Sequence, residues 1–172
     1  MARKKIANEF MEKVLMDSAW KSLSEDFQWT EQWLEKYKDK VDWKEISGNR
    51  NILWSPSMLE KFKKLLDWKS ISGTNCQLIL TEECLERFKD YWDWSELSEN
   101  TTIELNYALI DKFIDNWDWT ELINRWHEDS IYSAEFLEKY IEHIPSSKLQ
   151  DSRLWQTILD ERIEELKSEV IA

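Results

Sequence analysis

The chain has 172 residues, of which 42% are apolar and 13% aromatic, enough to fill the core of one domain. Two glycines and two prolines stand against 34% charged residues, which favours helices joined by short turns over a sheet of tight hairpins. The net charge of −12 discourages direct binding to nucleic acid and favours a protein partner with a basic surface.

The sequence shows no pattern typical of secretion or membrane insertion. No apolar run approaches the roughly 18 residues of a spanning helix, and charged residues interrupt the stretch after the basic MARKK. Two cysteines, Cys76 and Cys84, fit neither a disulfide framework nor a zinc site. We therefore expect a cytoplasmic protein that binds no membrane, metal or cofactor.

A tandem repeat organises the chain. Asp-Trp pairs recur, with tryptophans at Trp43, Trp68, Trp94 and Trp119 that lie 25, 26 and 25 residues apart. With the first apolar residue of each unit as position 0, positions 5, 8 and 17 are apolar in every unit. This alignment predicts six units that begin with Ile6, Trp29, Trp54, Leu80, Leu105 and Tyr132.

Each unit is predicted to contain two helices. Apolar residues at positions 0, 4, 5, 8 and 12 follow the helical period and predict a helix A of about three turns. Helix B is shorter, is capped by the Asp of the Asp-Trp pair, and is followed by Gly or Asn residues suited to a left-handed ending. Position 1 carries side chains that can cap helix A, namely Thr30, Ser55, Thr81, Asn106 and Ser133.

A unit of about 25 residues is too short to fold alone, so it must bury its aromatic face against its neighbours. We predict an all-α fold, an α-solenoid of about six tandem two-helix units that forms a single domain over residues 1–172. An apolar stripe after the sixth unit predicts a capping helix at about 152–170 over the last open face. The stripe consists of Trp155, Leu159, Ile163, Leu166 and Val170.

Tryptophan fills one column of the repeat. Position 14 is Trp in five of the six units, and we predict a buried ladder in which each indole N–H donates to a carbonyl. Trp33 and Trp54 also fall in apolar columns of helix A. Trp126 stands in the loop-like segment NRWHEDS and is the candidate for exposure.

The unit DWSELSEN at residues 93–100 has an altered form, DWKEISGN, at 42–49, and L-E-K-F or L-E-K-Y occurs in helix A of three units. It resembles the short tryptophan-rich repeats of giant-virus and some bacterial proteins, and the likeness covers residues 6 to about 150. The first unit has Ala19 in place of the Asp, and the sixth lacks the Asp-Trp pair. Because the function of those repeats is unknown, the resemblance implies a helical array and no active site.

Helix A carries two constant charged columns. Position 6 is acidic and position 7 basic in every unit, and position 10 is acidic in four. If the units stack, the acids form an acidic ridge able to receive a basic partner. The alternative is a solvated face in which the lysines of one helix pair with the glutamates of the next. The candidate partner-binding residues are Glu35, Asp39, Glu86, Asp90, Asp111, Asp115, Glu138 and Glu142.

No nucleotide-binding, nucleophile-elbow or EF-hand spacing is present, so we expect a non-enzymatic protein-interaction module or scaffold. The alternative is an acidic nucleic-acid mimic that inhibits a DNA- or RNA-binding protein. The net charge favours this alternative, but the basic column at position 7 does not. A hydrolase that uses His127 with Glu128 and Asp129 is a weaker alternative, because the sequence lacks HExxH spacing.

Overall fold

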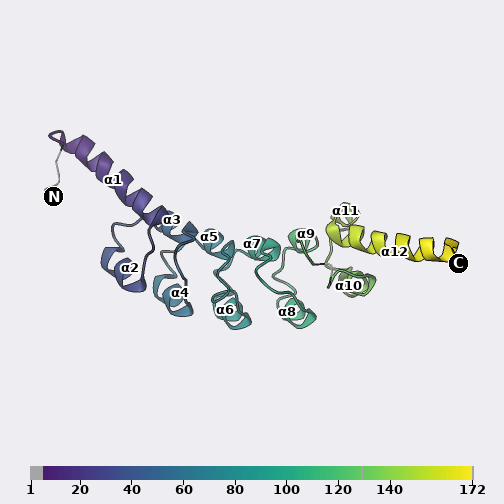
Figure 1. Ribbon diagram of the computed structural model, residues 1–172. Coiled ribbons are helices and arrows are strands. Elements are labelled where there is room, and N and C mark those ends of the chain that lie inside the picture. The colour runs from purple at the N-terminus through teal and green to yellow at the C-terminus, as the bar shows by residue number, and fades with distance from the viewer. Residues whose placement is uncertain (1–5, 129, 172) are drawn as a thin grey trace. The chain divides into compact units, whose positions relative to one another are not determined.

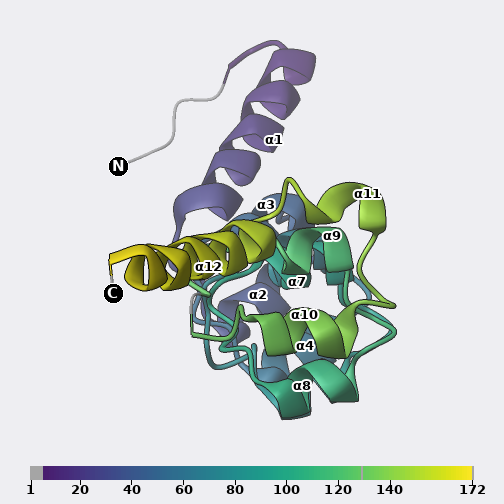
Figure 2. The same ribbon diagram turned by 90° about the vertical axis from the view of Figure 1, so that its right-hand side faces the viewer.

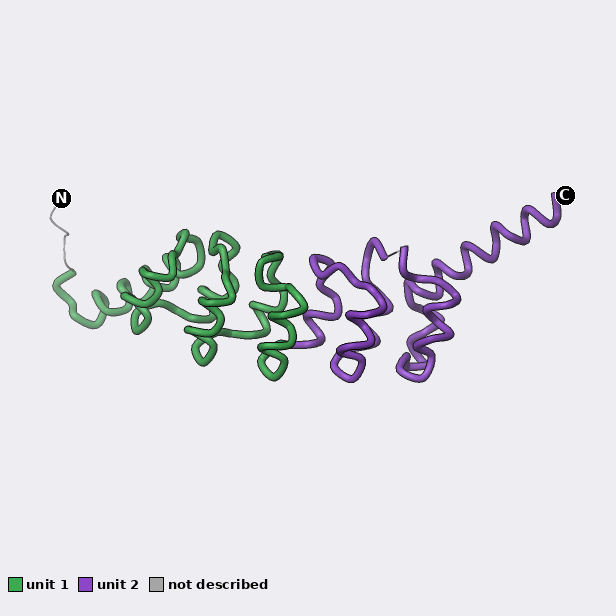
Figure 3. The backbone as a smooth tube through the Cα atoms, turned by 90° about the horizontal axis from the view of Figure 1, so that it is seen from below, with its two compact units in different colours: residues 1–92 green, residues 93–172 purple. Residues whose placement is uncertain are grey.

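The computed structural model describes residues 6–128 and 130–171, and every regular element among these residues is a helix (Figure 1). The all-α prediction is therefore confirmed. The chain divides into two compact units, residues 1–92 and 93–172 (Figure 3). Unit 1 contains α1 (Glu9–Asp26), α2 (Glu31–Tyr37), α3 (Trp43–Gly48), α4 (Pro56–Phe62), α5 (Trp68–Ser72) and α6 (Glu82–Arg87). Unit 2 contains α7 (Trp94–Glu99), α8 (Tyr107–Lys112), α9 (Trp119–Leu122), α10 (Ala134–Tyr140), α11 (Ser146–Leu149) and α12 (Arg153–Ile171).

The helices that correspond to helix A begin as predicted but end early. In α2, α4, α6, α8 and α10, the side chain at position 1 accepts a hydrogen bond from the amide three residues later, as Thr30 does from Trp33. These helices have six or seven residues, so the prediction of three turns is wrong. Position 0 precedes the cap and position 12 follows a turn, so the apolar spacing extends beyond the helix at both ends.

Helix B corresponds to α3, α5, α7 and α9, and the Asp caps three of these four helices. The prediction of a left-handed ending is wrong: the φ angles are −72° at Asn49, −84° at Gly73 and −71° at Asn100. Asn49 instead has an extended backbone, and its side-chain amide donates to the carbonyls of Ser24 and Phe27, both at 2.8 Å. The asparagine thus ties one repeat to the preceding one.

The first repeat is one helix rather than two. The 18-residue helix α1 begins at the Asn8 cap and continues through the predicted break. Ala19 stands where other units have the capping Asp, so no side chain there favours a new helix start. Met11 and Val14, which occupy core columns in the alignment, are 49% and 42% exposed, so the described residues do not bury them.

The C-terminal helix α12 forms over the predicted range but does not act as a cap along its length. The Leu154 amide donates to the Ile123 carbonyl at 3.1 Å, and the Leu154 side chain is buried. After this first turn, α12 leaves the short helices of unit 2 (Figures 1 and 2), and Leu159, Leu166 and Val170 are exposed. The prediction that this stripe covers an open face is wrong.

The buried cores follow the repeat columns away from the two ends of the chain. In unit 1, α3 contacts both α1 and α5, and in unit 2, α7 contacts α9. The side chains at positions 5 and 17 have no exposed area in the central repeats. These core residues are Leu34, Ile46, Leu59, Ile71, Leu85, Leu97, Ile110 and Leu122.

Candidate interaction surface

Buried serines at position 18 of the repeat connect consecutive repeats. Ser47 Oγ donates to the Trp43 carbonyl at 2.6 Å and accepts a hydrogen bond from the Asp67 amide of the next repeat at 2.9 Å. Ser24 and Ser98 make the same two contacts with the equivalent Trp and Asp. The signal for this contact was the serine of DWxxLS, which the sequence reasoning treated only as part of helix B.

The tryptophans of position 14 lie at the boundaries between repeats. Each ring packs on the position 8 aromatic ring of the following repeat, with centroids 5.0 to 5.6 Å apart. The prediction that their N–H groups donate to carbonyls is confirmed for Trp43, Trp68 and Trp119. The ring pairs are Trp20–Tyr37, Trp43–Phe62, Trp68–Phe88, Trp94–Phe113 and Trp119–Tyr140.

The prediction of a fully buried ladder is wrong for four of these five tryptophans. Only Trp119, at 7%, is buried, and the other four are half-buried. Trp119 has an additional cover, because the His143 ring stacks on it at 5.3 Å. Outside this column Trp54 is 1% exposed, whereas Trp33 is 44% and Trp126 is 61% exposed, so the expected exposure of Trp126 is confirmed.

Three residues of the basic column of position 7 pair with acids of the preceding repeat. The Lys61 ammonium lies 5.7 Å from the Phe62 ring of its own helix and 3.7 Å from the Glu35 carboxylate of the preceding repeat. The same acid–base pairing joins Arg87 to Glu60 at 3.4 Å, and it recurs at 2.8 Å between Lys139 and Asp111. The alternative of salt bridges between neighbouring repeats is therefore confirmed at these three boundaries.

Cationic neighbours lower the pKa of three acids of position 6. A hydrogen bond from Lys38 is the main cause that lowers the pKa of Glu35, and Lys63 has the same effect on the pKa of Glu60. Hydrogen bonds from Lys139 and then from Tyr140 lower the pKa of Asp111. Glu35, Glu60 and Asp111 therefore already have cationic partners.

The predicted acidic ridge therefore separates into engaged and available carboxylates. Glu35 and Asp111 form the ion pairs described above, and Glu86 also has a partner. The remaining predicted residues are exposed, and the described part of the chain shows no ion pair for any of them. These are Asp39 and Asp90 in unit 1, and Asp115, Glu138 and Glu142 in unit 2.

Consecutive repeats carry available acids only in unit 2. In unit 1, Lys64 occupies position 10 of the repeat between those of Asp39 and Asp90. In unit 2, Asp115 follows α8, while Glu138 and Glu142 lie on α10 and the turn after it. We call these three residues the acidic surface of unit 2; they are the part of the predicted ridge best suited to a partner.

The segment around His127 is organised by a buried arginine that sequence reasoning missed. Arg125 is 2% exposed, and its guanidinium donates to the Glu128 carboxylate at 2.8 Å and to the Ile103 carbonyl. Burial raises the pKa of Glu128 and lowers that of Arg125. Nε and Nη1 of Arg125 have no hydrogen-bond partner. An arginine in the apolar LINRW stretch was the available signal.

This arrangement gives no support to a hydrolytic site. His127 is exposed, has a left-handed backbone with φ of 63°, and is not bonded to Glu128, whose carboxylate pairs with Arg125. Asp129 lies outside the described residues. Within residues 6–128 and 130–171, no group of three His, Cys, Asp or Glu side chains is placed to hold a metal ion.

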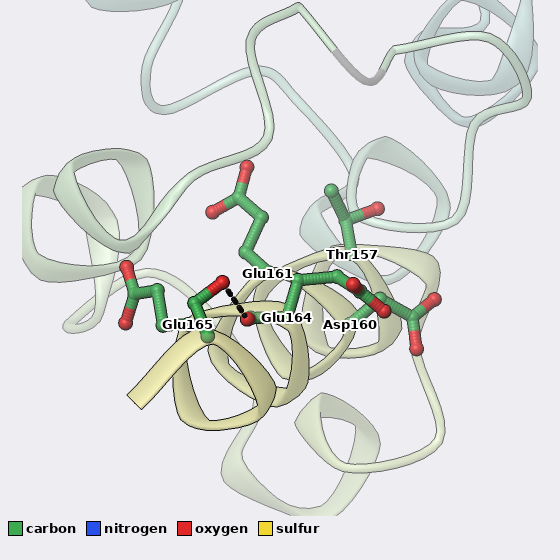
Figure 4. Close-up of a pocket in the computed structure, with 6 residues that line it drawn as sticks. Thr157, Asp160, Glu161, Glu164 and Glu165 are labelled. Atoms are coloured by element: carbon green, nitrogen blue, oxygen red, sulfur yellow. Dashed lines mark hydrogen bonds between the residues drawn. The ribbon is translucent and has the colours of Figure 1, made fainter. Parts of the chain in front are cut away.

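An open acidic hollow runs along α12 (Figure 4). Every residue that lines it belongs to this one helix, and the Ser168 hydroxyl donates to the Glu164 carbonyl at 3.0 Å. No second element faces these acids across the hollow, so it is a helix face rather than a binding cleft. Its residues are Thr157, Asp160, Glu161, Glu164, Glu165 and Ser168.

Neither the described helices nor comparisons with known proteins point to a membrane-spanning helix or to a known family. In the part of the chain that the structure describes, no helix has the length and apolar character needed to cross a membrane. Comparisons with protein-family models, with curated proteins and with solved structures found no match for this chain.

Proposed function

We propose that this chain is an α-solenoid of about six tandem repeats of the tryptophan-rich type, and that it acts as a non-enzymatic protein-interaction scaffold. The proposal rests on how the constant columns are used. The serine, tryptophan and basic columns make contacts between neighbouring repeats, which are the contacts a stacked array requires. These columns hold the array together, so partner recognition falls to exposed residues outside them.

The acidic surface of unit 2 is the proposed contact for a partner with a basic surface. Asp115, Glu138 and Glu142 are exposed and have no ion pair among the described residues. A partner that presents lysines or arginines gains complementary charge and faster association, and it does not have to break existing ion pairs. Glu35, Glu60 and Asp111 already form ion pairs and would not offer this advantage.

The rival function, a nucleic-acid mimic, has support in the net charge of −12. A mimic needs a row of uncompensated negative charges, because phosphate groups in nucleic acid carry no fixed cations between them. Here Lys139 lies between acids and pairs with Asp111 at 2.8 Å. Because a lysine lies between the acids, this surface is less like a phosphate backbone than a mimic requires. The interleaving therefore favours recognition as a protein surface of mixed charge.

The proposal is tested by reversing the charges of the acidic surface. The variant D115K/E138K/E142K changes three exposed acids, and a matched control, E25K/D151K/E161K, changes three other exposed acids without ion pairs. Each tagged protein is used for affinity purification from the native host, with mass spectrometry at low and moderate salt. We expect the wild type and the control to recover one specific basic partner that the first variant loses.

Two results would count against this function. Equal recovery by the wild type and the acidic-surface variant would remove the surface from recognition. Recovery of a DNA- or RNA-binding protein that duplex DNA displaces, with binding that falls steeply between low and moderate salt, would favour the mimic instead. Circular dichroism of both variants checks that their helices are intact.

A further inference from the structure

An exposed apolar stripe distinguishes α12 from the other helices of unit 2. Leu159, Ile163, Leu166 and Val170 are 41%, 39%, 52% and 86% exposed, although all four are aliphatic. Ile163, Leu166 and Val170 line one shallow apolar groove together with Ile171. Contiguous apolar surface of this kind marks an interaction site.

The spacing of the stripe selects a helical partner. The four residues follow one another at intervals of four, three and four, the spacing of the inner positions d, a, d and a of a coiled coil. The opposite face of α12 carries the acidic residues of the hollow described above (Figure 4). Between residues 159 and 170 the apolar stripe is thus a narrow seam on an otherwise polar helix surface, as in a helix that pairs with one other helix.

The charges beside the seam are complementary to a second copy of the same helix. Asp160 and Lys167 follow the d positions and so occupy e, whereas Arg162 and Glu169 precede the a positions and occupy g. In an antiparallel pair e faces e and g faces g, so Asp160 meets Lys167 and Arg162 meets Glu169. In a parallel pair g faces e of the next heptad, which places Arg162 against Lys167.

We propose that α12 is a self-association element through which two copies of this chain pair antiparallel. Ile163 of one copy packs against Leu166 of the second copy, and Leu159 packs against Val170, so the contact is two-fold symmetric and closed. The ion pairs that Arg162 and Lys167 make within α12 are at least 60% exposed and exchange readily for contacts across the pair.

The interface is short, which sets the expected strength. The seam from 159 to 170 is about 18 Å long at the helical rise, and an interface of this length buries less than the roughly 1,200 Å² of a stable complex. Association is therefore reversible and depends on protein concentration. The proposal is independent of the acidic surface of unit 2, because the two surfaces share no residue.

Sedimentation equilibrium of the full chain tests the pairing. From about 1 µM to several hundred µM, across the range of weak association, we expect the mass to rise from 20.9 kDa to that of a dimer and no further. I163D/L166D places charge in the seam and should weaken pairing by at least about tenfold. F10D/V14D changes exposed apolar residues of α1 and should leave pairing unchanged.

Three results of this experiment would overturn the proposal. A wild type that stays monomeric throughout would refute self-association. Equal loss of pairing in F10D/V14D would show that α12 binds α1 of another copy. Assembly beyond the dimer would also indicate such a head-to-tail contact, because heterologous contacts of this kind form open chains.

A charge exchange tests the orientation. K167E places two acids opposite each other in the antiparallel pair and should raise its dissociation constant severalfold, whereas in a parallel pair it would create an attraction to Arg162. D160K/K167E restores the e to e attraction and should return the dissociation constant to near the wild-type value. Tighter association in K167E, or no recovery in D160K/K167E, would refute the antiparallel arrangement.

Discussion

Replacing Ser47 by alanine removes the hydroxyl that bridges two repeats of unit 1. Its Oγ lies 2.6 Å from the Trp43 carbonyl and 2.9 Å from the Asp67 amide, and the residue is 3% exposed. The Trp43 carbonyl keeps its place in the helix, but the part-buried Asp67 N–H loses its acceptor. Leaving this N–H without an acceptor costs about 1–3 kcal/mol. The higher helix propensity of alanine returns about 0.5 kcal/mol. We therefore expect S47A to lose about 0.5–2.5 kcal/mol of unfolding free energy.

Urea unfolding followed by tryptophan fluorescence measures this change. With an m value of about 2 kcal/mol/M, the midpoint of S47A should fall by roughly 0.25–1.25 M while the slope stays unchanged. S22A is the matched control: Ser22 is an exposed residue of α1, so its loss should change stability by less than about 0.5 kcal/mol. If S47A unfolds at the midpoint of S22A, the buried serine does not join the repeats.

Two further predictions concern charged groups. Because Lys139 and Tyr140 lower the pKa of Asp111, this carboxylate stabilises the fold above its unfolded pKa of about 3.9, and the contribution disappears as pH falls through the folded pKa. Urea midpoints of D111N should thus lie below wild type at pH 7 and converge with it in acid. E128Q should cost about 3 kcal/mol because it leaves the buried Arg125 uncompensated, whereas R125M/E128Q should match or exceed wild-type stability in the same assay.

Local features of the sequence predicted the helix starts. A residue such as Thr30 caps its helix with its own side chain, so the pattern alone identifies it. Features that depend on neighbours were predicted less well. Met11 fits a core column but is 49% exposed, and Val170 fits an apolar stripe that no other described part of unit 2 covers. Periodicity indicates an apolar face and does not say what lies against it.

At the candidate interaction surface, too, local features were predicted better than contacts with neighbouring repeats. The charged columns were visible in the sequence, but the pairing of Arg87 with Glu60 depends on the distance between repeats, which the sequence does not contain. Arg125 was missed because its partners include a main-chain carbonyl 22 residues earlier, at Ile103. The constant charged columns indicated a shared role, and only the contacts showed which of their residues join neighbouring repeats.

Two Asp-Trp pairs that look alike in sequence should respond differently to the same substitution. Asp42 Oδ1 accepts hydrogen bonds from the amides of Lys44 at 3.0 Å and Glu45 at 3.3 Å, so it caps α3. Asp67 makes no capping bond to α5, and its carboxylate accepts instead from the Ser70 hydroxyl. D42A therefore loses a cap worth about 1 kcal/mol, whereas D67A loses mainly the charge at the helix start, worth about 0.5 kcal/mol.

Both backbone amides keep their bonds to the serines of the preceding repeat, so the joints are matched and only the caps differ. Thermal unfolding followed by circular dichroism should place the midpoint of D42A below that of D67A, with the wild type above both. Equal midpoints would show that the Asp of this repeat acts through its charge alone. The reverse order would show that the bond between Asp67 and Ser70 stabilises helix B more than a direct cap does.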